Sequence, residues 1–166
     1  MKLKLFGIFA LVLAISIGVW LEVSQKPMAP MVSATTLRGE TLNLADLKGK
    51  VVLVNFWATS CTTCMGEMPK LVAVHQKYAA QGYETLAVAM DYDPTDYVKN
   101  YAEKNALPFK VAMDSKGDIA RAFGGVRLTP TSVLIDKQGR IVQTYLGEPD
   151  FAQFQSLVES LLKKSA

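Results

Sequence analysis

The sequence of 166 residues has few of the side chains on which metal centres depend. It contains one histidine, His75, and two cysteines, Cys61 and Cys64. A tetrahedral zinc site usually takes four such ligands, so we expect no metal centre of that kind. The excess of basic over acidic residues is also small, 18 against 15, and the net charge is +3. This charge predicts no nucleic-acid partner.

Tracts of biased composition are absent as well. The sequence has no internal repeat and no low-complexity segment, and 50% of its residues are hydrophobic. A chain of this length and composition has material for one globular domain with a sizeable core.

One long uncharged run, Leu5–Leu21, follows the basic start Met1–Lys4. Its 17 residues are just sufficient to cross a bilayer, with Trp20 at the far interface. Small residues suited to signal cleavage come only far downstream, at Val32–Ala34, so an uncleaved anchor is favoured over a cleaved signal. The basic side of such an anchor stays in the cytoplasm. We therefore expect residues 5–21 to anchor the chain in the cytoplasmic membrane, with the rest in the periplasm, where disulfides persist.

The order of apolar runs and turns after this run predicts an α/β fold. We assign residues 1–25 to the signal-anchor segment, 26–34 to a linker, and 35–166 to one folded domain. Alternating strands and helices predict a central mixed sheet with helices on both faces. The expected strands are 51–56, 83–89, 109–113, 131–135 and 141–145, the expected helices are 62–81, 93–105, 117–123 and 151–164, and a hairpin is expected over 35–44.

The two cysteines are spaced C-x-x-C and follow the apolar run 51–56. Cys61 and Cys64 would lie where a buried strand ends and a helix begins. Free backbone N–H groups and the helix dipole at such a position lower the pKa of a thiol. The thiolate is the form that attacks a disulfide. The pattern therefore predicts a dithiol–disulfide exchange site, with Cys61 as the exposed nucleophile and Cys64 as the thiol that releases the product.

Other interpretations of the cysteine pair stay open on the sequence alone. Two thiolates at this spacing could bind Cu(I), as in a copper chaperone, although no third soft ligand lies near Cys61. A structural disulfide across two residues would close too small a loop to stabilise the fold much. A thiol peroxidase is disfavoured because Ala58 occupies the place of the threonine in the pattern P-x-x-x-T-x-x-C.

We expect structural roles for His75 and for the acidic stretch after residue 90. His75 falls in the middle of an expected helix, where a surface or packing role is more common than metal binding. The acidic stretch Asp91–Asp96 lacks the glycine and terminal glutamate of an EF-hand, so it predicts a loop and helix cap.

Several motifs, taken in order, can be compared with known families. They are Val-Asn-Phe-Trp-Ala at 54–58, the C-x-x-C pair, Glu67–Pro69, Leu128–Thr131 before a strand, and an inserted strand–helix segment around 83–113. In this order they resemble the thioredoxin-like superfamily, and within it the membrane-anchored bacterial TlpA/ResA type. The resemblance covers roughly Ser33–Leu162. It implies a thioredoxin-like fold and a thiol–disulfide oxidoreductase that uses the Cys61–Cys64 disulfide and no separate cofactor.

The resemblance also implies roles for individual residues. Pro130 matches the family's cis-proline, which packs against the disulfide and exposes the Thr129 backbone to a substrate strand. Glu67 lies one helical turn beyond the second cysteine, where a partly desolvated carboxyl of raised pKa would exchange protons during the reaction. The alternative for Glu67 is an ordinary solvated helix residue. Trp57 is expected to support the disulfide by packing, and Asn55, where thioredoxin has a buried aspartate, to be structural.

The motif departs from thioredoxin close to the cysteines. Ser60 replaces a second tryptophan, Thr63 replaces a proline, and neither position between the cysteines is a histidine, which strongly oxidising members use. We therefore expect a moderately lowered pKa for Cys61 and either a reductant or a thiol–disulfide exchanger of intermediate potential. The resemblance implies disulfide-containing or dithiol partner proteins, in cytochrome c maturation or the assembly of an oxidase metal site. It also implies a membrane electron donor that resets the enzyme.

Overall fold

The computed structural model describes residues 26–165, so the predicted anchor lies outside the described residues. Within that range, no helix is both long and apolar enough to cross a bilayer. The elements are β1 (Ser33–Thr35), β2 (Thr41–Asn43), η1 (Leu44–Leu47), β3 (Val51–Trp57), α2 (Thr62–Tyr78), η2 (Ala79–Gln81), β4 (Tyr83–Ala89), α3 (Thr95–Lys104), β5 (Lys110–Met113), α4 (Asp118–Ala122), β6 (Thr131–Ile135), β7 (Ile141–Leu146) and α5 (Phe151–Leu162).

The main sheet has five strands in the order β5-β4-β3-β6-β7. Strands β3, β4 and β5 are parallel, whereas β6 and β7 run antiparallel to their neighbours. All seven residues of β3 and of β4 are buried. Strands that are covered on both faces are mostly apolar in sequence, which is why the sequence predicted them well. The exceptions are buried polar residues, Asn55 in β3 and Glu84 and Thr85 in β4. The mixed sheet confirms the predicted α/β architecture.

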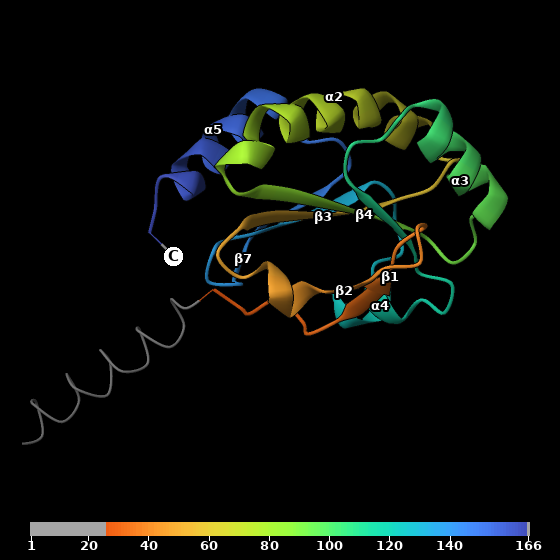
Figure 1. The fold of residues 1–166 in the computed structure, drawn as a ribbon, viewed down its shortest axis with the longest axis horizontal. Coiled ribbons are helices and arrows are strands. Elements are labelled where there is room, and N and C mark those ends of the chain that lie inside the picture. The colour runs from red at the N-terminus through yellow and green to blue at the C-terminus, as the bar shows by residue number, and fades with distance from the viewer. Residues whose placement is uncertain (1–25, 166) are drawn as a thin grey trace, which may run out of the picture.

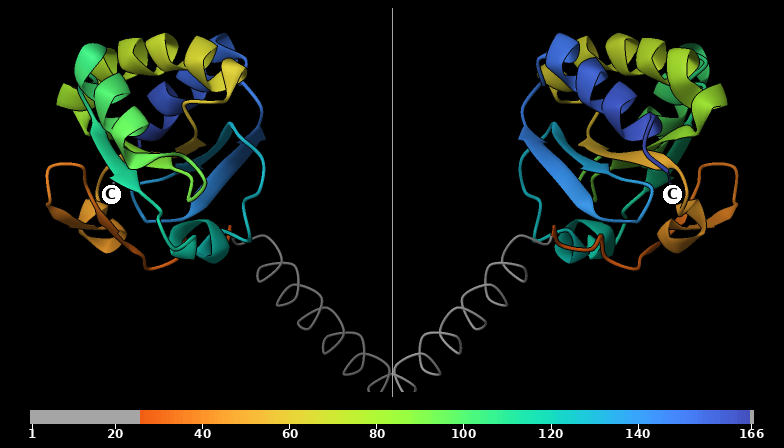
Figure 2. Two further views of the ribbon diagram at one scale, coloured as in Figure 1. Left: turned by 90° about the vertical axis from the view of Figure 1, so that its right-hand side faces the viewer. Right: turned by 90° about the vertical axis from the view of Figure 1, so that its left-hand side faces the viewer.

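Helices cover both faces of this sheet (Figures 1 and 2). Helices α2, α3 and α5 lie on one face, and α4, η1 and the β1–β2 hairpin lie on the other. The side chains of Leu53, Leu71 and Phe154 belong to the core under α2 and α5. Val54 and Phe56 point to the opposite face and belong to a second core. Successive side chains of β3 point to opposite faces of the sheet and therefore contribute to two hydrophobic cores.

Helix α2 ends earlier than the predicted residue 81. Its last residue is Tyr78, and a 3-10 turn, Ala79–Gln81, leads to Gly82. Gly82 has φ of 94°, a left-handed conformation that glycine adopts without a steric penalty. Pro69 lies inside the helix and does not end it.

The segment predicted as a linker is bonded to the domain. Met28 forms an isolated bridge with Arg140, and the backbone N–H of Ala29 donates to the carbonyl of Gly139 at 2.8 Å. Strand β1 begins at Ser33, before the expected boundary at residue 35. The chain therefore joins the folded unit from about residue 27 onward, because its backbone groups find partners more than 100 residues away.

Candidate active site

The two cysteines lie between the carboxyl end of β3 and the start of α2. Cys61 is the N-cap residue of α2, and a disulfide joins it to Cys64, with the Cα atoms 5.2 Å apart. Cys61 is half-buried, whereas Cys64 is 1% exposed. Cys61 was predicted to be the exposed sulfur; it is half-buried, and it is the more accessible of the two cysteines.

The helix start supplies a donor to the accessible sulfur. The backbone N–H of Cys64 points at Sγ of Cys61, with a nitrogen–sulfur distance of 3.1 Å. An N–H group and the positive end of the helix dipole both favour a negative charge at this place. The prediction that the Cys61 thiol of the reduced protein has a lowered pKa depends on this geometry.

Asp93 fixes the loop that carries the first cysteine. Its carboxylate accepts two hydrogen bonds of 2.6 Å from Thr59, one from the backbone N–H and one from the hydroxyl. Asp93 is buried, and the cap expected from the acidic stretch is wrong, because the N-cap of α3 is Pro94 and has no side-chain bond. The sequence offered no signal for this contact, since the two residues are 34 positions apart.

Glu67 is buried on the inner side of α2 and is not the solvated alternative. It is 1% exposed, and neither carboxylate oxygen has a hydrogen-bond partner among the described residues. Burial raises the pKa of Glu67 to about 7, helped by the nearby negative charge of Glu148 and opposed by Lys70. The carboxyl thus changes protonation near neutral pH, one helical turn from Cys64.

Lys70 and Glu148 act on Glu67 from the protein surface. Lys70 lies one turn further along α2 and forms an ion pair with Glu148, which follows β7. Neither residue was predicted from the sequence. A positive charge three residues after Glu67 was visible in the sequence, but its partner comes from a segment 78 residues away.

Two polar side chains of β3 and β6 lie on the same sheet face. The Asn55 amide donates to the Ser132 hydroxyl at 2.9 Å, and both residues are buried. Asn55 is therefore hydrogen-bonded, as expected of a structural residue. Trp57 is fully buried and packs against Tyr101, with ring centroids 5.5 Å apart. Trp57 is in the same core cluster as Cys64, consistent with the predicted supporting role.

The peptide bond between Thr129 and Pro130 is cis, as the resemblance implied. Thr131 at the start of β6 pairs with Phe56 near the end of β3, so the preceding two residues lie beside the segment that leads to Cys61. Pro130 is buried and Thr129 is half-buried. The hydroxyls of Thr129 and Tyr92 are 3.3 Å apart, and Tyr92 is an exposed side chain that the sequence analysis did not select.

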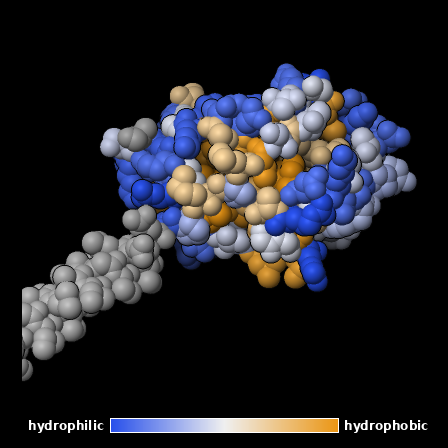
Figure 3. Space-filling view, turned by 90° about the horizontal axis from the view of Figure 1, so that it is seen from below, coloured by the Kyte–Doolittle hydropathy of each residue, from blue (hydrophilic) through white to orange (hydrophobic). Residues whose placement is uncertain are grey.

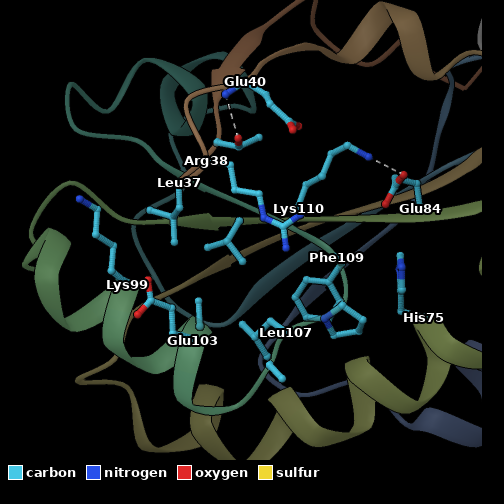
Figure 4. A pocket seen from close by; sticks show the side chains of 15 residues that line it. Leu37, Arg38, Glu40, His75, Glu84, Lys99, Glu103, Leu107, Phe109 and Lys110 are labelled. Atoms are coloured by element: carbon cyan, nitrogen blue, oxygen red, sulfur yellow. Dashed lines mark hydrogen bonds and ion pairs between the residues drawn. The ribbon is translucent and has the colours of Figure 1, made fainter.

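His75 lies farther along α2, in the wall of a cavity of about 950 Å³ (Figure 4). Its Nδ1 is 3.4 Å from the Thr85 hydroxyl, and its ring packs edge-on against Tyr83 and Phe109. Burial lowers the pKa of His75, which favours the neutral ring. The predicted packing role is confirmed. Within residues 26–165, no three histidine, cysteine, aspartate or glutamate side chains are grouped closely enough to hold a metal ion.

This fold occurs in solved structures described as thioredoxin-family proteins. A thiol:disulfide interchange protein of the thioredoxin family from Chlorobium tepidum TLS is 32% identical and has a TM-score of 0.77, with 84% of this chain and 98% of that chain covered. A solution structure from Neisseria meningitidis is 40% identical with a TM-score of 0.78, covering 85% and 93%. The fold and the cysteine pair therefore define a thioredoxin-like protein.

Sequence comparisons narrow this class. The Redoxin family model matches residues 23–160. The thiol-disulfide oxidoreductase ResA of Bacillus thuringiensis subsp. konkukian (strain 97-27) is 42% identical over 137 residues, covering 82% of this chain and 75% of the relative. ResA of Halalkalibacterium halodurans is 33% identical over 126 residues, covering 74% and 70%. The chain therefore belongs to the Redoxin family and is a thiol–disulfide oxidoreductase that uses its cysteine pair without a separate cofactor.

Proposed function

We propose that this oxidoreductase reduces disulfides of partner proteins outside the cytoplasm, while its N-terminal segment holds it at the membrane. The observation that carries the proposal is the pairing of an accessible sulfur at a helix start with the buried carboxyl of Glu67, whose pKa is about 7. The apolar run Leu5–Leu21 after a basic start supports the membrane location.

The reaction begins with the reduced dithiol. The Cys61 thiolate attacks one sulfur of the partner's disulfide, that disulfide breaks, and the departing partner thiolate takes up a proton. The product is a mixed disulfide between Cys61 and the partner. The backbone beside Thr129 and Pro130 would hold the partner segment as an added strand, because these residues precede β6 next to the cysteine loop.

The second step releases the partner. Ionised Glu67 accepts the proton of Cys64, and the resulting thiolate attacks Sγ of Cys61. The mixed disulfide breaks and its electron pair leaves with the second partner sulfur. Overall, two electrons pass from the Cys61–Cys64 dithiol to the partner, and the enzyme is left with its own disulfide. Because Glu67 is screened from water, the proton is transferred directly from Cys64 to Glu67 and not to bulk water.

The partners are expected from the family resemblance. Apocytochrome c, or an assembly factor with a cysteine metal site, would present the disulfide. A dithiol donor in the membrane would return two electrons to the Cys61–Cys64 disulfide. The names of the relatives, thiol-disulfide oxidoreductase ResA, support thiol–disulfide exchange with such partners.

A trapping experiment tests the proposal. In the full chain carrying Cys64→Ser, the second step is blocked, so Cys61 should accumulate mixed disulfides with partners in the membrane fraction. The matched control carries Cys61→Ser, which leaves only the sheltered Cys64 and should trap little. Mass spectrometry of the captured proteins then identifies the substrate class.

The outcomes separate the parts of the proposal. Extracytoplasmic proteins with cysteine pairs among the captured species would support it. Capture of cytoplasmic proteins alone would contradict the location. No capture by the Cys64→Ser protein, while the wild type reduces a model disulfide normally, would contradict the proposed class of substrate.

A further inference from the structure

An apolar groove of about 310 Å³ lies at the end of the domain where the described chain begins. Leu44, Leu47, Val52 and Ile135 contribute buried side chains to it. Apolar side chains are exposed on the face that Figure 3 presents, within a polar surround. The groove is open to solvent along a segment that the sequence analysis treated only as a linker.

Two methionines at the groove are unusually exposed. Met28 is 55% exposed and Met31 is 92% exposed, and both line the groove. Methionine is flexible and apolar, and it adapts to irregular or mobile surfaces. An exposed apolar groove with such a rim is typical of an interaction surface.

Unpaired positive charge borders the groove. Lys48 lines it, and Arg140 is opposite Met28 in the isolated bridge. Both residues are exposed, and neither side chain has a hydrogen bond or ion pair within residues 26–165. The neighbouring acids are already engaged: Asp46 accepts from Asn43, and Asp136 accepts from two backbone N–H groups. These donors are uncharged, so Asp46 and Asp136 keep their negative charge beside Lys48 and Arg140. Of the four side chains, Lys48 and Arg140 are the two without a partner among the described residues, and they are free to pair with lipid phosphates.

The chain length fixes how far this groove can lie from an anchor at Leu5–Leu21. Only five peptide units separate Leu21 from Lys26, which span at most about 18 Å when fully extended. Met28 follows two residues later and is bonded to the domain through Arg140. If the apolar run is in the bilayer, this end of the domain is held close to the lipid headgroups.

We propose that the groove bordered by Met28 and Met31 docks on the interface of a bilayer that contains anionic lipid. This inference rests on the proposed membrane tether. The methionines and the groove contact the acyl–headgroup boundary, and Lys48 and Arg140 contact lipid phosphates.

Docking at this groove would determine whether the active site faces toward or away from the membrane. Val52 lies at the start of β3, and the cysteine loop follows the other end of that strand. Seven residues of β-strand span about 20 Å. The disulfide would therefore face away from the membrane surface, where partner proteins can reach Cys61.

Depth-dependent fluorescence quenching tests the docking. The full chain carrying Trp20→Phe is reconstituted into vesicles of phosphatidylcholine and phosphatidylglycerol with brominated acyl chains. Ala45→Trp places the probe at an exposed groove residue distant in sequence from the anchor, and Tyr97→Trp places a control on exposed α3. Trp57 is buried in both proteins. Its fluorescence is measured in the Trp20→Phe protein without a probe and is subtracted. We expect quenching of the probe at residue 45 to exceed that at residue 97 by about twofold or more.

Charge reversal supplies the second arm. Lys48→Glu with Arg140→Glu should reduce the quenching at residue 45, whereas the matched change Lys99→Glu with Lys116→Glu should not. Vesicle flotation reports the tether independently. A protein that floats while both probes are equally quenched, or both unquenched, would overturn the docking and leave the tether intact. A protein that does not float would overturn the tether and the docking together, while disulfide reductase activity in solution would be retained.

Discussion

Lys70 on α2 forms an ion pair with Glu148, which follows β7, and the two charges act in opposite directions on one buried carboxyl. Glu148 raises the pKa of Glu67 and Lys70 lowers it, on top of the larger effect of burial. The surface charges of Lys70 and Glu148 therefore partly determine the protonation of Glu67 near neutral pH. An ion pair of this kind contributes little to stability, so its removal mainly changes chemistry.

Replacing Glu148 by glutamine should move the pKa of Glu67 below about 7. The change removes a negative charge and frees Lys70, and both effects favour the ionised carboxyl. Lys70→Gln should move the pKa the other way. The pH dependence of disulfide exchange, together with the infrared carboxyl band of Glu67, measures both shifts. Identical pH profiles for the two variants would reject the coupling.

The stability of the oxidised protein should depend on pH through Glu67. The folded-state pKa of about 7 lies above the ordinary value of 4.5, so the folded state holds this proton more tightly than the unfolded chain. The stabilisation is complete below pH 4.5 and is lost as pH rises to about 7.

Glu67→Gln removes this contribution to the pH dependence. Relative to the variant, the wild type should lose up to about 3 kcal/mol of unfolding free energy between pH 4 and pH 8, since each pKa unit is worth about 1.4 kcal/mol. Urea denaturation at both pH values gives the comparison. Parallel pH dependences in the two proteins would mean that the carboxyl titrates at its ordinary pKa.

Asp93→Ala should loosen the cysteine loop. It removes the acceptor of two hydrogen bonds from Thr59 and leaves a partly buried N–H without its partner, at a cost of about 1–3 kcal/mol. Urea denaturation measures the loss, and the exposed neighbour Asp91→Ala serves as the control. A Thr59→Val and Asp93→Ala double-mutant cycle isolates the interaction, and additive effects would argue against it.

The local features of the site could be predicted from the sequence. The apolar runs of β3 and β4 indicated buried strands, and the cysteine spacing indicated a helix start with two sulfurs on one side. Such signals depend on neighbouring residues and on the periodicity of regular structure.

The long-range contacts could not be predicted in this way. Asp93 reaches Thr59 and Glu148 reaches Lys70 only after the sheet has brought distant segments together. The pairing of Met28 with Arg140 is of the same kind, so a proline-containing segment that resembled a linker is bonded to the domain. The pattern of a single sequence does not show which residues so far apart will meet. All three contacts depend on the tertiary fold.

The pKa of the Cys61 thiol in the reduced Cys64→Ser protein tests the central claim most directly. It is measured from the pH dependence of alkylation, with the same protein in denaturant as the reference. The helix start and the N–H at 3.1 Å predict a pKa below that of the same thiol in the denatured protein. A value at or above that of the denatured protein would contradict the account.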